Sequence, residues 1–202
     1  MAHEDLWEQL KKLDGQQTAQ RAKCQYMSHP ARYVVTMLNT EYVIDLSTKK
    51  IYLIESAPDQ ETTGFLEQLC LLAYLINAKD LPLADTLVNA NALPAGQFFF
   101  RGIHNLPTGK LEKAFGDCPS RLYDVSEPFG ATRCEFGDVS IRLSVLPRVP
   151  LTFIVWGQCE EFPARASILF DKSAADQLPL DALLAAVNVT LDALLNATKA
   201  DE

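Results

Sequence analysis

The residues with the most scope for chemistry lie in two short segments, and the first is AGQFFFRGIHNLP, residues 95–107. Three consecutive aromatic residues, with Phe99 in the middle, precede Arg101 and His104. Aromatic rings and a planar guanidinium group together suit a flat or anionic ligand. The imidazole of His104 could serve as a general base or as an axial metal ligand. This segment is therefore the first candidate binding site.

The second segment, residues 146–179, combines a run of apolar residues with acidic ones. Glu160 and Glu161 follow the apolar run, and Asp171 ends the next one. Carboxyl groups beside an apolar wall can have raised pKa values and act as acid or base. Adjacent residues on a strand point to opposite faces, however, so Glu160 and Glu161 could not form a facing pair there.

Both segments also have a purely structural interpretation. The first could be a strand that packs Phe98 and Phe100 inward, with the arginine solvated and His104 in a turn. In the second, Glu160 and Glu161 could lie in a solvated hairpin link. These alternatives use the same residues and assign them no chemical role.

A shared cleft would give the two segments a joint function. Arg101 and His104 would supply positive or titrating groups, and Glu160, Glu161 and Asp171 would supply carboxylates. Pockets are usually lined by apolar side chains and oriented by a few polar groups, which is the mixture that both segments carry. A hydrolase that uses the histidine with one of these acids is one possible outcome.

Familiar motifs of catalysis and metal binding are missing from the sequence. Nothing matches a phosphate-binding loop, a dinucleotide fingerprint, H-E-x-x-H or G-x-S-x-G. The three histidines are scattered, and the cysteines form no C-x-x-C pair. We therefore expect no structural metal and no disulfide. The cysteines are Cys24, Cys70, Cys118, Cys134 and Cys159.

The charge balance argues against two classes of partner. The chain has 18 Lys and Arg residues against 26 Asp and Glu residues, a net charge of -8 and a sequence pI of about 4.9. Nucleic acids and anionic membranes are both bound through clustered basic residues, so neither is an expected partner. No run of eighteen apolar residues and no basic, apolar leader is present. We therefore expect a cytoplasmic protein.

The first half of the chain is expected to contain helices, a β meander and a buried helix. Residues 5–13 and 16–23 show helical patterning, and Phe65–Asn77 is apolar on nearly every side, as is typical of a buried helix. Short polar links separate three segments rich in β-branched and aromatic residues. These predicted strands are residues 33–38, 41–46 and 50–54.

The second half is expected to form strands followed by an amphipathic C-terminal helix. Residues 132–145 alternate between polar and apolar, which indicates a half-buried sheet. The unbroken run at residues 151–156 predicts a central strand, with residues 167–170 as its neighbour. Seven apolar residues between Leu180 and Leu195 lie on one helical stripe, so this helix should cross the sheet.

This order predicts an α+β fold with mixed or antiparallel sheets around a buried central helix. Residues 1–202 are expected to form a single domain, in which residues 1–60 could be a subdomain of helix and meander. Residues 81–94 contain two prolines and are expected to be a loop, and residues 110–115 a short helix.

Two stretches resemble a family found in bacteria and archaea, the domain of unknown function numbered 3786. They are LLAYLINAKDLPLADTLVNANALPAGQFFFRG and LPRVPLTFIVWGQCEEFPARASILFDKSAADQLP. The resemblance covers nearly the whole chain. It implies an organism with anaerobic metabolism, and some members resemble fusions to a cysteine-rich iron–sulfur module. This chain lacks that cysteine cluster.

Residues and resemblance together lead to two functional hypotheses. The first is a domain that binds a small ligand or cofactor in anaerobic metabolism. Its ligand would be flat, for example a tetrapyrrole or a corrinoid, with Arg101 and His104 at the site. The alternative is a non-catalytic interaction module that assists a redox enzyme. An exposed apolar patch without a deep pocket would favour the second hypothesis.

Overall fold

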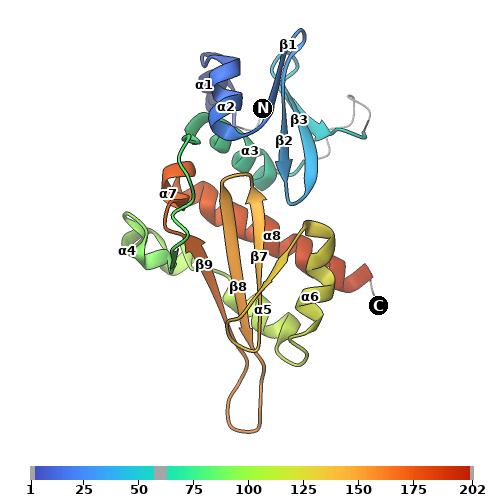
Figure 1. Cartoon of the computed structure of the whole chain (residues 1–202), viewed down its shortest axis with the longest axis vertical. Coiled ribbons are helices and arrows are strands. Elements are labelled where there is room, and N and C mark those ends of the chain that lie inside the picture. Colours follow the sequence, from blue (N-terminus) through green and yellow to red (C-terminus); the bar gives the residue numbers. More distant parts are fainter. Residues whose placement is uncertain (1–2, 57–62, 201–202) are drawn as a thin grey trace.

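The computed structural model describes residues 3–56 and 63–200, which form two antiparallel sheets and several helices (Figure 1). The predicted α+β class is confirmed. Buried side chains from Trp7 to Leu194 belong to one large hydrophobic cluster, to which both sheets and the long helices contribute.

The N-terminal part contains two helices and a four-stranded meander in the order β1-β2-β3-β4. The three predicted strands are present, and the sequence analysis missed β1, which pairs with β2. Asp14 caps the second helix by accepting a hydrogen bond from the Gln17 amide at 2.8 Å. The elements are α1 (Glu4–Lys11), α2 (Gly15–Ala22), β1 (Gln25–Ser28), β2 (Ala31–Met37), β3 (Thr40–Asp45) and β4 (Lys50–Leu53).

The rest of the chain forms the second sheet and the helices that cover it. Its elements are α3 (Phe65–Asn77), β5 (Leu87–Val88), η1 (Ala90–Ala92), α4 (Gly96–Phe99), η2 (Gly102–His104), α5 (Thr108–Phe115), α6 (Arg121–Ser126), η3 (Glu127–Phe129), β6 (Thr132–Cys134), β7 (Val139–Leu146), β8 (Val149–Trp156), β9 (Arg165–Asp171), α7 (Ala174–Gln177) and α8 (Leu180–Ala200). The predicted loop at residues 81–94 thus contains the short strand β5 and the turn η1.

The second sheet has the order β5-β9-β8-β7-β6, with β8 in the centre as predicted. Phe153 of β8 lies opposite Ile141 of β7 and Ile168 of β9, and all three side chains are buried. Every pair of strands in this sheet is antiparallel. The apolar side chains of β7, β8 and β9 therefore form a continuous surface against the helices.

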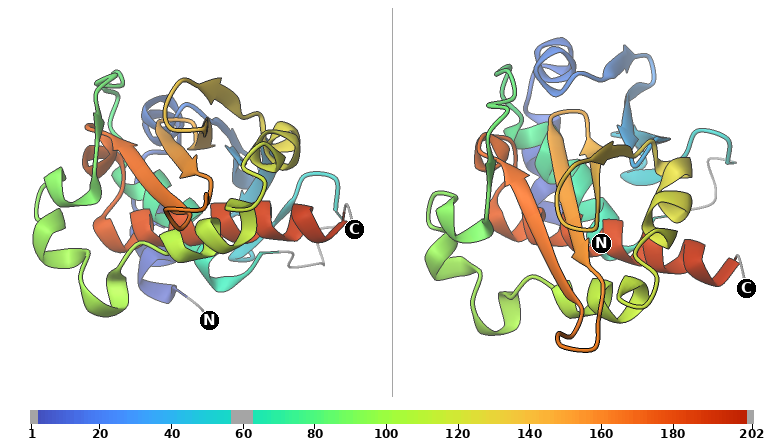
Figure 2. Two further views of the ribbon diagram at one scale, coloured as in Figure 1. Left: turned by 90° about the horizontal axis from the view of Figure 1, so that it is seen from below. Right: turned by 60° about the horizontal axis from the view of Figure 1, so that its bottom comes forward.

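Helix α8 runs along one face of the second sheet (Figure 2) and also packs against α3. Four residues of its predicted stripe are buried, Leu183, Val187, Leu191 and Leu194, and the other three are half-buried. The Cys70 thiol, in α3, lies 3.7 Å from the Ala182 carbonyl oxygen of α8 and is buried as a small apolar side chain. By length and composition alone, α8 could also cross a membrane, but the buried stripe is what a core helix requires.

The two sheets meet at the β2–β3 turn. Leu38 and Asn39 both have positive φ angles, 48° and 62°, which suit the right-handed twist of a hairpin. A leucine is unusual in that conformation. Here the Leu38 side chain is buried, and its amide donates a hydrogen bond to the Val145 carbonyl of β7 at 3.1 Å. The contact between the sheets accounts for the unusual residue.

Leu72→Ala tests the central position of α3. Leu72 is fully buried, so the substitution is expected to lower the free energy of unfolding by about 2–5 kcal/mol. The matched control is Leu81→Ala, because Leu81 is 42% exposed and should change stability by less than about 0.5 kcal/mol. Urea denaturation of both variants gives the comparison. Equal losses would contradict the placement of α3 in the core.

Candidate functional site

The first candidate segment, residues 95–107, folds into α4 and the short 3₁₀ turn η2. The ring of His104 stacks on that of Phe99, with centroids 4.6 Å apart and planes within 3° of parallel. The alternative of an inward-packing strand is wrong, because Phe98 is 71% exposed in α4. Phe100 is buried beside Phe170 of β9, as that alternative expected for this one ring.

Arg101 and His104 do not line the cavity that adjoins their own segment. The Arg101 guanidinium lies 5.9 Å from the centroid of the exposed Phe98 ring. A cavity of about 390 Å³ adjoins the segment, but the segment contributes Phe100, Asn105 and Leu106 to its lining and neither of the two basic residues. The aromatic and basic side chains of residues 98–104 contact one another: Phe99 contacts Phe100 and His104, and Arg101 lies near Phe98.

The acidic residues lie at opposite ends of β9. Glu160 and Glu161 are exposed in the link between β8 and β9, so the prediction of a solvated hairpin link is confirmed. Asp171 is the last residue of the strand, about 20 Å from Arg165 at a rise of about 3.3 Å per residue. The structure therefore does not bring the three carboxylates together around one ligand.

The surroundings of Asp171 indicate that this residue has a structural role. Its side chain is 1% exposed, and Oδ1 accepts hydrogen bonds from the Ala84 amide at 2.9 Å and from the Ser173 amide and hydroxyl at 2.9 and 2.5 Å. Burial opposes ionisation, but these hydrogen bonds outweigh it and hold the pKa of Asp171 below its ordinary value. A carboxylate with a lowered pKa is a poor general base. The role of Asp171 is structural instead, because its hydrogen bonds tie the end of β9 to Ala84 and Ser173.

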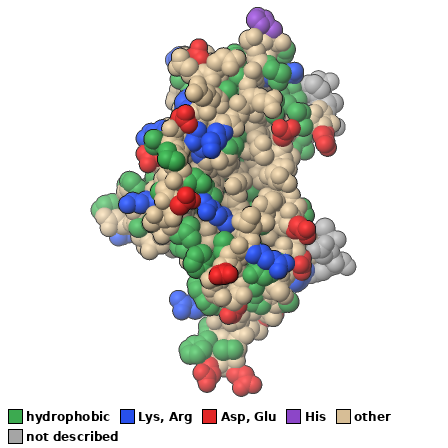
Figure 3. Space-filling model, in the orientation of Figure 1, with side chains coloured by type: hydrophobic (Ala, Val, Ile, Leu, Met, Phe, Trp, Pro, Cys, Tyr) green, Lys and Arg blue, Asp and Glu red, His purple; other side chains and the backbone are tan. Residues whose placement is uncertain are grey.

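An apolar hollow lies at the base of the β8–β9 hairpin. This hairpin pocket has a volume of about 540 Å³ and is lined by Asp138, Trp156, Gly157, Cys159, Phe162, Pro163 and Arg165. The hairpin projects at the lower tip of the molecule in Figure 1. Figure 3 shows apolar side chains beside acidic ones at that tip. Phe162 is 64% exposed and Trp156 38% exposed, so both rings are available to a ligand.

Local contacts hold the hairpin pocket in shape. Gly137 has a φ of 58°, and a Cβ atom there would lie 2.7 Å from Ile154 Cγ2 and 3.1 Å from Trp156 Cε2. The close approach of this turn fixes the indole from one side. Asp138 accepts a hydrogen bond from the Gly157 amide at 2.8 Å, and the Gln158 amide donates to the Gly116 carbonyl at 3.0 Å. The first bond joins the two hairpin turns, and the second anchors the link to the end of α5.

The sequence analysis missed Trp156, Phe162 and Arg165 as site residues. The apolar run at residues 151–156 predicts that Trp156 is buried with the rest of the strand, whereas it is the exposed last residue of β8. The available signal was Phe162 itself, a large aromatic side chain directly after Glu160 and Glu161 in the link. That Phe162 and Trp156 line one pocket depends on how β8 and β9 pair, which periodicity does not show.

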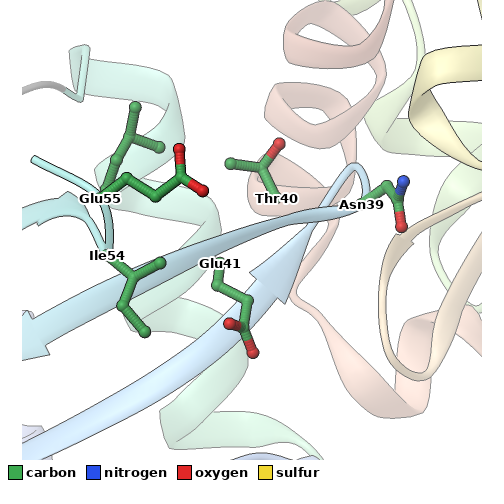
Figure 4. Close-up of a pocket in the computed structure, with 6 residues that line it drawn as sticks. Asn39, Thr40, Glu41, Ile54 and Glu55 are labelled. Carbon is green, nitrogen blue, oxygen red and sulfur yellow. The ribbon is translucent and has the colours of Figure 1, made fainter.

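A further pocket, of about 340 Å³, lies beside the β2–β3 turn and is drawn in Figure 4. Glu41 and Glu55 both line it. Figure 4 shows their carboxylates extending in different directions, so they do not form a facing pair. Within residues 3–56 and 63–200, no three His, Cys, Asp or Glu side chains gather as metal ligands.

Comparison with known proteins identifies a family and no closer relative. A family model described as a domain of unknown function, DUF3786, matches residues 14–193. No curated protein and no solved structure matches the chain. The matched range includes α2, both sheets and the hairpin pocket.

Asp171→Asn tests the structural role of this carboxylate. Because its pKa is lowered in the folded chain, ionised Asp171 stabilises the fold above the unfolded-state pKa, near 3.9. That contribution is lost as pH falls through the lower folded-state pKa. At pH 7 we expect a loss of about 1–3 kcal/mol in the free energy of unfolding, typical of hydrogen bonds to a charged group.

The difference between wild type and Asp171→Asn should shrink below about pH 4. Chemical denaturation at several pH values measures it. Asp117→Asn, at an exposed position, is the control and should leave stability nearly unchanged at every pH. A constant difference between wild type and Asp171→Asn down to pH 2 would show that the charge of Asp171 has no stabilising role.

Proposed function

Because the chain belongs to the DUF3786 family, whose description assigns no function, we propose a function from its geometry: it is a domain that binds a flat, anionic small molecule in the hairpin pocket. The single observation behind the proposal is the composition of this pocket. Two exposed aromatic side chains, Trp156 and Phe162, line the same hollow as Arg165.

The lining residues define the chemistry of the ligand. Aromatic rings bind flat molecules by stacking, and a guanidinium group binds carboxylates or phosphates through two parallel hydrogen bonds. Arg165 is exposed and forms no ion pair with any residue that the structure describes. The volume, about 540 Å³, lies within the usual range of about 300–1,000 Å³ for ligand pockets.

A tetrapyrrole or a corrinoid in anaerobic metabolism remains our proposal for the ligand class. Tetrapyrroles are flat and carry carboxylate groups, which suits Trp156, Phe162 and Arg165. His104 does not line the hairpin pocket, so the proposal gives it no role as an axial ligand. The proposed ligand class is thus the same as in the sequence-based hypothesis, but different residues bind the ligand.

The second candidate is an interaction module that assists a redox enzyme. The observation that favours it is the wide exposure of Phe162 and of Phe136, which is 46% exposed close to the same hairpin. Aromatic side chains and arginine are enriched at the centre of protein interfaces. A partner that covers this surface would also contact Glu160 and Glu161, whereas a small ligand need not do so.

Titration of the full chain with hemin and with a corrinoid, followed by calorimetry, tests the proposal. Phe162→Ala removes an aromatic wall and should raise the Kd about tenfold, as expected for the loss of one buried ring. Phe98→Ala is the matched control, because Phe98 is exposed to a similar extent but lies in α4. Arg165→Gln should weaken binding of the anionic probe, and Arg101→Gln should not.

The exposed thiols provide a second readout. Cys159 lines the hairpin pocket and Cys118 does not, although both are exposed. A bound probe should slow the alkylation of Cys159 and leave that of Cys118 unchanged. The proposal fails if neither probe binds, or if Phe98→Ala and Phe162→Ala weaken binding equally. Failure with both probes would leave the interaction module as the better account of the exposed rings.

A further inference from the structure

The outer edge of strand β9 is only partly covered, by β5 at its end and by helix α5 near its start. On one side it pairs with β8 from Arg165 to Phe170. On the other side β5 pairs with only two of its residues, Phe170 and Asp171. Residues 165–169 therefore have one neighbouring strand where a central position in the sheet would give them two.

Two hydrogen bonds show which backbone groups face this edge. The Lys172 amide donates to the Thr86 carbonyl, on the β5 side, at 2.9 Å, and the Ala166 amide donates to Glu112 Oε1 at 3.1 Å. Backbone groups alternate in direction along an antiparallel strand, so the even-numbered residues face away from β8. The amide and carbonyl of Ile168 and the carbonyl of Ala166 thus face the edge beyond the end of β5.

A groove follows this part of the edge. It is the cavity of about 390 Å³ beside residues 95–107, and Ala166, Ser167 and Ile168 of β9 form one wall. The remaining lining residues are Asn89, Ala90, Asn91, Phe100, Asn105, Leu106 and Thr108. No lining residue is charged, and several carry amide or hydroxyl groups. Asn91, Asn105 and Thr108 form no side-chain hydrogen bond with another described residue, whereas Asn89 caps η1.

We propose that this groove binds an extended, uncharged segment of another polypeptide as an added strand antiparallel to β9. Unpaired backbone groups on a sheet edge are a template for such a strand. The amides of Asn91 and Asn105 can bond to the outer edge of the bound segment, which a free sheet edge would leave to water. Because no lining residue is charged, a segment without charged side chains fits this groove best.

Hydrogen exchange in the free chain tests the edge itself. If the register is as described, the Ile168 amide should exchange at least tenfold faster than the amides of Ser167 and Leu169, which face β8. Two-dimensional NMR follows all three residues in one sample. Equal protection of the three amides would overturn the proposal, because the edge would then already be occupied.

Selection of displayed random octapeptides on the full chain tests the binding. Enriched peptides should slow exchange of the Ile168 amide, and N-methylation of alternate peptide residues should reduce affinity at least tenfold in one register only. Asn105→Lys should abolish binding by placing a charged side chain in the groove. Gln97→Lys adds the same charge at an exposed position of α4 that does not line the groove, and should bind normally.

The proposal is overturned if no peptide is enriched over selection on Asn105→Lys, or if bound peptides leave Ile168 unprotected. It is also overturned if N-methylation is equally damaging in both registers. Phe162→Ala should bind the peptides normally, so the result is independent of the hairpin pocket.

Discussion

Two arginine side chains join helix α2 to the end of α3 and to the β7–β8 turn by donating to main-chain carbonyls. Arg21, in α2, donates to three carbonyls at the end of α3, those of Leu75, Ile76 and Ala78. The last carbonyls of a helix have no partner within it, so an arginine there caps the helix. Arg148, in the β7–β8 turn and 4% exposed, donates to the carbonyls of Arg21 and Leu81 at 2.7 Å each and pairs with Asp80. A buried guanidinium must have its donors satisfied, so α2, α3 and this turn are fixed at one point.

The fixed point and the hairpin pocket lie at opposite ends of the second sheet. Arg148 immediately precedes β8, whereas the hairpin pocket follows Trp156 at the other end of the same strand. Strands β7 and β8 are mostly buried between these ends and form a rigid unit. The position of the turn therefore fixes the position of the hairpin. The exposed hairpin can then vary in side chains without disturbing the junction, an arrangement common where loops on a rigid scaffold carry binding residues.

Burial explains which elements the sequence could predict. Phe65–Asn77 and the run at residues 151–156 are apolar on nearly all sides, and only a core position accommodates such segments. The two-residue strand β5 could not be predicted, because it exists through its pairing with β9 and through the bond from the Ala84 amide to Asp171. The hairpin pocket depends likewise on the pairing of β8 with β9. Long-range register leaves no periodic trace in a single sequence.

The same reasoning applies to the most conspicuous cluster of residues in the sequence, at residues 98–104. Phe99 and His104 lie close in sequence and satisfy each other by stacking, so their proximity creates no cavity. Trp156 and Arg165 are nine positions apart and directly opposite each other on paired strands, where they can share one ligand. Arg165 lines the hairpin pocket and Ala166 the groove. The hairpin pocket uses β9 only at Arg165, and the groove uses residues 166–168, so the two proposed sites share the strand but no lining residue.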